Sequence, residues 1–121
     1  MKIIKMADVK QEEIAGDLFE GKVSRQVLID SDVSKEFMAN LINFSPGARN
    51  IFHKHTNEQI LYVTVGKGIV ATEQEEHVVT PGTIILIPAG ENHWHGAVPE
   101  SAFSHIAITV PGQKTSFQGR T

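Results

Sequence analysis

The sequence predicts an all-β domain, built as an antiparallel sandwich or barrel. From Val23 onward, short runs rich in β-branched and aromatic residues follow one another, and Gly, Pro and Asn separate them at roughly ten-residue intervals. No long helical pattern interrupts these runs. The 121 residues are the size of one domain, and a hydrophobic content of 40% is enough to build a core.

Recognisable turns separate the expected strands. Residues 1–20 carry mixed charge with isolated apolar positions, so we expect an N-terminal arm with at most one helical turn, at Val9–Ile14. Residues 65–68 and 80–82 predict tight turns, because proline presets φ and glycine supplies a positive φ. We expect nine strands, over residues 23–29, 36–44, 50–54, 59–65, 68–73, 76–80, 83–87, 93–98 and 102–110.

The barrel is expected over residues 21–110, between two less regular ends. The C-terminal tail, residues 111–121, has no strand pattern and is expected to be either a loose arm or a segment that docks on a partner subunit. Exposed strand edges in a short barrel are commonly covered by dimerisation. We therefore expect a homodimer, with residues 23–29 as the strand that pairs across it.

Composition excludes several classes of function. The absence of cysteine excludes a disulfide framework, a cysteine zinc finger, an iron–sulfur cluster and thiol catalysis. A net charge of −3, with 11 scattered basic residues, argues against nucleic-acid binding and against a polybasic membrane surface. There is no apolar run of about 18 residues, and charges appear too early in Met1–Asp8 for a signal peptide. We expect a cytoplasmic protein that acts on a small molecule.

The histidines are concentrated in one part of the chain. Six are present, and all of them fall in the segment from His53 to His105. Residues two apart in a strand share a face, so His53 lies beside His55 and His93 lies beside His95. Two such pairs on separate strands predict a metal site.

Gln59 is the candidate for a further ligand. Its parity groups it with the apolar positions Leu61 and Val63, hence with the barrel interior, where an amide needs a polar partner. Imidazole nitrogens with one amide oxygen suit Zn, Fe, Ni, Co and Mn. His77, by contrast, is expected to be a hydrogen-bonded surface residue.

Two motifs resemble those of a known family. The run Gly47-x5-His53-x-His55-x3-Gln59-x6-Gly66 resembles the first motif of the cupins, with Gln where most members have Glu. The run Pro81-Gly82-x5-Pro88-x-Gly90-x2-His93 resembles the second motif, with Gly96 where Asn is common. The resemblance implies a double-stranded β-helix, or jelly-roll barrel, with one divalent metal ion per chain. The ligands that it implies are His53, His55, Gln59 and His93.

A narrower resemblance covers roughly residues 17–110. The segments around His53–Gly66, Pro88–Ala97 and Ser104–Ile108 are similar to the cupins associated with carboxymuconolactone decarboxylases, a subgroup that includes manganese-dependent hydroxynitrile lyases. This implies Mn as the ion, with Fe, Ni, Co and Zn left open, and His105 as the acid or base. The longer acidic and aromatic C-terminal extension of that subgroup is missing here.

The neutral ligand set bears on the expected chemistry. Three imidazoles and an amide leave the full +2 charge on the ion, which favours Lewis-acid chemistry over oxygen activation. His95 is expected to orient a ligand or donate into the pocket, and Phe44 and Phe103 are expected to form apolar walls.

The expected function is a metal-dependent enzyme that carries out a lyase or decarboxylation-like step on a small oxygen-bearing substrate. A cupin dioxygenase, a non-catalytic metal- or ligand-binding module and an inert structural barrel are the alternatives.

Overall fold

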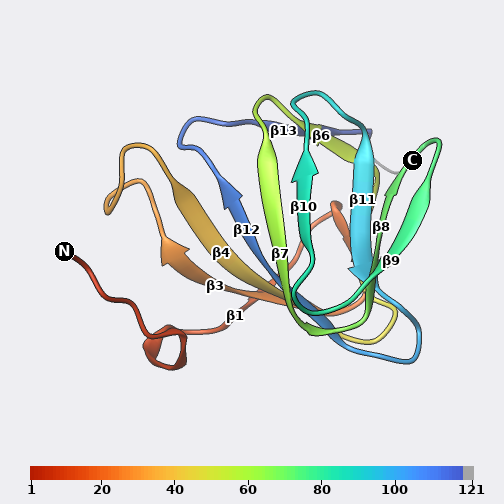
Figure 1. Cartoon of the computed structure of the whole chain (residues 1–121), viewed down its shortest axis with the longest axis horizontal. Helices are drawn as coiled ribbons and strands as arrows, with labels where there is room; N and C mark the ends of the chain where they lie inside the picture. Colours follow the sequence, from red (N-terminus) through yellow and green to blue (C-terminus); the bar gives the residue numbers. More distant parts are fainter. Residues whose placement is uncertain (119–121) are drawn as a thin grey trace.

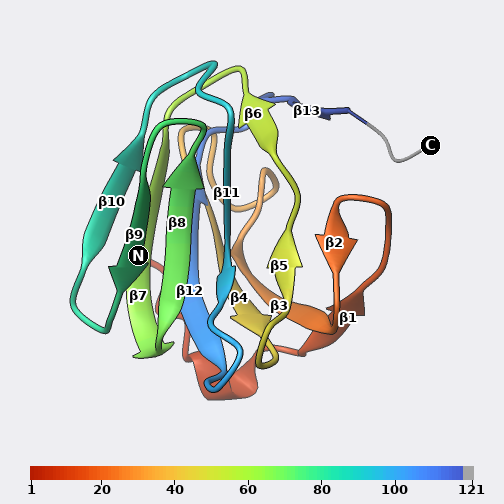
Figure 2. The same ribbon diagram turned by 90° about the vertical axis from the view of Figure 1, so that its right-hand side faces the viewer.

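Two β-sheets face each other and enclose the core in the computed structural model, which describes residues 1–118 (Figures 1 and 2). The strands of the first sheet are β1 (Glu12–Ile14), β3 (Val23–Ile29), β4 (Met38–Phe44), β12 (Phe103–Thr109), β7 (Gln59–Gly66) and β10 (Ile84–Ile87), in that spatial order. The strands of the second sheet are β13 (Thr115–Phe117), β6 (His53–His55), β11 (His93–Ala97), β5 (Arg49–Asn50) and β2 (Phe19–Glu20), with β8 (Gly68–Thr72) paired to β11 and β9 (Glu76–Val79) paired to β8. The predicted all-β jelly-roll fold is confirmed.

The strand that was expected over residues 50–54 is interrupted, so this prediction is wrong in its middle. β5 ends at Asn50 and β6 begins at His53. Between them, the Ile51 N–H donates to the carbonyl of Leu18 at 2.8 Å, and the Ile51 carbonyl accepts from the His53 ring at 2.7 Å. The second bond takes a carbonyl that a continuous ladder would need.

Both ends of the chain are more regular than expected. The helical turn that was expected at Val9–Ile14 is wrong, because Glu12–Ile14 forms β1 and pairs with β3; a single 3-10 turn lies earlier, at Met6–Asp8. The tail was expected to have no strand, yet β13 pairs antiparallel with β6. Both short strands gain their hydrogen bonds from a neighbouring strand, which local alternation in a sequence does not reveal. Residues 119–121 of the tail lie outside the described residues.

The alternation of each strand divides its side chains between the core and the surface. On β7, Leu61 and Val63 are fully buried, whereas Ile60 and Tyr62, which alternate with them, point outward. Phe44 and Phe103 also have almost no exposed surface. This apolar core continues directly into the histidine cluster described below. Within residues 1–118, no helix has the length and apolar character needed to cross a membrane.

Two glycines permit close approaches around this core. Gly66 has φ +78° at the turn between β7 and β8, and a Cβ atom there would collide with the carbonyl of Ala102. A Cβ atom on Gly96 would lie 2.6 Å from the Ala48 carbonyl oxygen, where β11 passes β5. Glycine at position 96, where the second cupin motif often has Asn, therefore lets these two strands pair.

Candidate metal centre

Three histidines converge between the sheets. β6 contributes His53 and His55, and its pairing with β11 places His93 directly across from His53. The ring centroid of His53 lies 4.3 Å from that of His93 and 4.9 Å from that of His55. One nitrogen from each of the three rings lies within 4.8 Å of the others, so the group can hold a metal ion.

Hydrogen bonds on the far side of the rings fix which nitrogen is free. Nδ1 of His53 lies 2.7 Å from the carbonyl oxygen of Ile51, and Nδ1 of His93 lies 2.8 Å from that of Glu91. A carbonyl oxygen only accepts, so both Nδ1 atoms carry the proton and both Nε2 atoms carry a lone pair. A partner on the outer nitrogen is the usual arrangement around a histidine that binds metal.

His55 is held in the same way, but by the C-terminal tail. Its Nδ1 lies 3.1 Å from Oε1 of Gln113 and 2.9 Å from Oγ1 of Thr115, the first residue of β13. Its Nε2 is buried and has no hydrogen-bond partner among the described residues, and the same holds for the Nε2 of His93. Nothing in the sequence pattern of the tail had indicated this contribution.

Gln59 occupies the interior position that its parity predicted. It is the first residue of β7 and is buried, and its Oε1 has no hydrogen-bond partner. A buried acceptor without a partner costs free energy, and a cation is one group that would satisfy several such acceptors together. The unpartnered atoms of His55, His93 and Gln59 therefore fit a divalent metal ion.

Burial keeps these rings neutral. Desolvation lowers the pKa of His53 from 6.5 to about 3, with a further contribution from His93. Desolvation also lowers the pKa values of His55 and His93, and the hydrogen bond that the His55 ring donates to Gln113 acts in the opposite direction for His55. Neutral imidazole is the form that binds metal, so the rings do not have to lose a proton at pH 7.

A second pair of histidines lies deeper in the barrel. Nε2 of His105 lies 3.0 Å from Nδ1 of His95, and both residues are buried. Asn50 accepts from the backbone N–H of His95 through Oδ1 at 2.8 Å, so its Nδ2 faces the His95 ring, 3.3 Å from each nitrogen. Phe44 and Phe103 pack against His105, with ring centroids 5.6 and 5.5 Å away.

His95 connects the two groups of histidines. Its ring centroid lies 5.6 Å from that of His53 and 4.7 Å from that of His105. Burial lowers the pKa of His95 well below its usual value and that of His105 to about 3. Nδ1 of His105 is buried and has no hydrogen-bond partner. Both rings of the pair are thus neutral, and Nδ1 of His105 is available to accept a proton.

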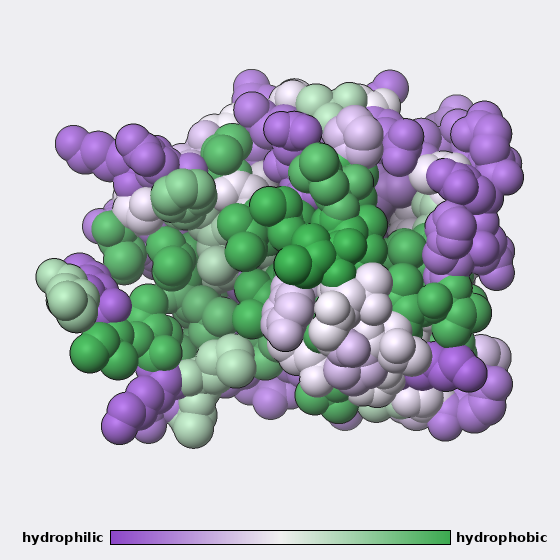
Figure 3. Space-filling model, viewed as in Figure 1, coloured by the Kyte–Doolittle hydropathy of each residue, from purple (hydrophilic) through white to green (hydrophobic). Residues whose placement is uncertain are grey.

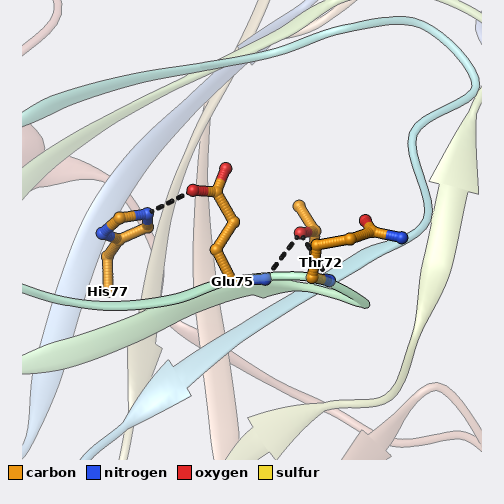
Figure 4. A network of polar contacts seen from close by, with 4 residues as sticks. Thr72, Glu75 and His77 are labelled. Carbon is orange, nitrogen blue, oxygen red and sulfur yellow. Dashed lines mark hydrogen bonds and ion pairs between the residues drawn. The ribbon is translucent and has the colours of Figure 1, made fainter.

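Two residues near these motifs have surface roles. His77 is exposed, and its Nε2 lies 3.1 Å from a carboxylate oxygen of Glu75, whose backbone N–H donates to Thr72 (Figure 4). The expected surface role of His77 is confirmed. Trp94, between the two buried histidines of β11, stacks under the guanidinium of Arg49, which lies 3.6 Å from the ring centroid.

The buried histidines predict how stability depends on pH in the metal-free protein. The folded-state pKa values of His95 and His105 lie below 6.5, so the unfolded chain binds more protons as the pH falls below 6.5. The free energy of unfolding should be fully retained above pH 6.5. It should then fall toward pH 3, each group contributing up to about 1.4 kcal/mol per pH unit.

Urea unfolding in the presence of a chelator, at a series of pH values, measures this dependence. The His77→Gln variant is the control and should keep the same profile, because it removes only an exposed ring. A free energy of unfolding that stays constant between pH 6.5 and 4 would contradict the prediction.

Comparison with known proteins identifies the family. A model of the cupin domain matches residues 40–109. The chain is 36% identical to an (R)-mandelonitrile lyase of Granulicella tundricola over 96 residues, which are 76% of this chain and 71% of that protein.

Solved structures agree in fold. A cupin-like protein of Thermotoga maritima superposes with a TM-score of 0.83 at 30% identity, covering 88% of this chain and 84% of its own. A polyketide cyclase of Streptomyces resistomycificus superposes with a TM-score of 0.84 at 25% identity, covering 99% and 88%. With a cupin model that matches more than half of the chain and this likeness in fold, the chain belongs to the cupin family.

Proposed function

We propose that this cupin is a manganese-dependent lyase that breaks a carbon–carbon bond beside a hydroxyl group in a small oxygen-bearing substrate. The main observation behind this proposal is that two groups of histidines lie side by side in the interior of the barrel. Three histidines have their protons held on the outer nitrogens, and the buried His95–His105 pair lies alongside them. The likeness to a relative whose name specifies mandelonitrile cleavage supports the same class of reaction.

His53, His55, His93 and Gln59 would hold the ion. Nitrogen ligands with one amide oxygen suit Mn among several divalent metals, and manganese is also what the resemblance to the subgroup implies. When bound, a divalent ion supplies positive charge that polarises a substrate oxygen. Since all four side chains are neutral, none of them offsets that charge, which favours this role over oxygen activation.

His105 is proposed as the group that moves the proton. Its open Nδ1 can accept the substrate hydroxyl proton when Nε2–H donates to Nδ1 of His95, and that contact stabilises the protonated ring. Because the pKa of His105 is held at about 3, the protonated ring is a strong acid. It returns the proton readily to the carbon fragment that leaves with the bonding electron pair.

The first expected outcome concerns metal content. Protein purified without chelator should carry about one divalent ion per chain, and His53→Ala should lose it, because two nitrogen ligands do not hold the ion as three do. Elemental analysis of both proteins measures this. His77→Ala removes a histidine outside the cluster and should keep the ion. Equal metal content in the wild type and His53→Ala would argue against the site.

The second expected outcome concerns the proton transfer by His105. His105→Ala should lower the rate of mandelonitrile cleavage by about 10²- to 10⁴-fold while metal content stays unchanged. The aldehyde released is followed by its absorbance, with His77→Ala as the matched control.

Retention of full activity by metal-loaded His105→Ala would remove the proposed role of that ring. If the wild type binds metal but cleaves no cyanohydrin, the chain is better described as a metal-binding module or a cupin of another reaction class.

A further inference from the structure

Two more buried oxygens on the inner face of the barrel have no hydrogen-bond partner among residues 1–118. They are Oδ1 of Asn40 on β4 and Oγ1 of Thr109 on β12. Asn40 shares the face of β4 that carries Phe44, and Thr109 shares the face of β12 that carries His105. Both oxygens therefore belong to the interior in which the histidines lie.

Strand register places these oxygens beside the candidate metal site. Ala107 on β12 lies across from Asn40 on one side and from Leu61 on the other. The last pair of the β12–β7 ladder is Ile108 with Ile60, so Thr109 at the end of β12 and Gln59 at the start of β7 are the next residues of the two strands. Gln59 and Thr109 therefore carry unpartnered oxygens at the same end of β7 and β12, and Asn40 lies one inward-facing position further along β4, across from the small side chain of Ala107.

We propose that Asn40 and Thr109 form a polar subsite that binds a hydroxyl group of the substrate. This hydroxyl group lies at the opposite end of the substrate from the oxygen that faces the metal. This inference rests on the proposed function for the metal-facing end. A hydroxyl fits both partners, because it donates to the Asn40 carbonyl and accepts from the Thr109 hydroxyl. A carboxylate would leave the Asn40 oxygen unsatisfied. The substrate class is therefore small hydroxy compounds with a second hydroxyl group.

The test compares two probes that differ by one group. Dihydroxyacetone and hydroxyacetone present the same hydroxyketone, and only the first has a hydroxyl at the far end. Calorimetric titration of manganese-loaded wild type should give a dissociation constant about tenfold lower for dihydroxyacetone. Thr109→Val and Asn40→Leu should each bring the two constants close together, because they remove a partner of that hydroxyl without a large change in volume.

A second measurement needs no ligand. Thr109→Val removes an unpartnered buried hydroxyl, so it should raise the thermal midpoint of the metal-free protein. Thr64→Val is the matched control on the same sheet. The Thr64 hydroxyl donates to the Ser104 carbonyl at 3.3 Å, so this change should lower the midpoint and leave the probe preference intact.

The results separate this inference from the proposed function. Equal affinity for the two probes, no binding of dihydroxyacetone, or a lowered midpoint in Thr109→Val overturns the subsite. Metal content and the His105→Ala assay test the proposed function independently, because neither uses these probes.

A second inference comes from the opposite face of the same sheet. Two rows of side chains cross its outer surface in register, and every one of them is uncharged. The first row is Ile84, Tyr62, Ile106 and Leu41. The second row is Leu86, Ile60, Ile108 and Ala39. Figure 3 shows hydrophobic residues gathered over β7 and β10 and continuing toward β4.

The area of this face approaches what a stable dimer needs. Ile84 and Leu86 are 67% and 58% exposed, and Tyr62 and Ile60 are 40% and 37% exposed. At roughly 200 Å² for a fully exposed side chain of this size, these four present on the order of 400 Å², already a large patch for a monomer. The half-buried residues of both rows extend it toward the roughly 800 Å² per partner of a stable interface.

The geometry points to a second copy of this chain as the partner. An uncharged apolar face is complementary to itself, as a two-fold interface requires. The alternative location, the strand over residues 23–29, is β3, and within the chain its first residues, Val23–Arg25, already pair with β1 on one side and β4 on the other. We therefore place the dimer interface on the outer face of this sheet.

Sedimentation analysis tests this face. The wild type should sediment as a dimer, and Ile84→Glu should sediment as a monomer with unchanged circular dichroism and metal content, because a dimer would bury the new charge. Val78→Glu is the control, since Val78 is 58% exposed on β9 of the other sheet, and it should remain dimeric. A monomeric wild type, or a dimeric Ile84→Glu, overturns the interface.

Discussion

The Nδ1 protons of His53 and His93 are held by backbone carbonyl oxygens, and the arrangement of the candidate site depends on those two hydrogen bonds. They fix the tautomer of each ring and aim the two lone pairs at a common point. They also explain the break between β5 and β6, because the carbonyl of Ile51 serves a histidine instead of a neighbouring strand. The interruption of the ladder and the geometry of the site have the same cause.

The interior of the barrel contains both apolar side chains and the polar groups that the proposed reaction requires. His105 is enclosed by Phe44 and Phe103, so the ring that is proposed to move a proton is built into the hydrophobic core. Burial of this kind costs stability unless the ring stays neutral and finds a partner, and His95 supplies one. Asn50 in turn holds His95. A chain of contacts thus links the candidate metal site to the deepest part of the barrel.

A single sheet serves two purposes because side chains alternate along a strand. On β12, His105 and Thr109 face the interior that holds the other buried histidines, while Ile106 and Ile108 face outward. The inner positions carry the unpartnered oxygens and the outer positions carry an uncharged apolar surface. The same ladder therefore positions the proposed substrate contacts and the proposed dimer face, so a shift in strand register would disturb both.

The sequence by itself determined the central strands of the barrel and which residues make up the candidate site. Period-two spacing sufficed to place His53 with His55, and to place Gln59 inside, because parity along a strand is a local property. Tertiary structure alone decided what joins residues far apart in the chain. The pairing of β13 with β6 brings Gln113 and Thr115 to His55, and the facing of two sheets brings His95 to His105. These contacts depend on register and on packing between sheets, for which no local pattern in the sequence provides a signal.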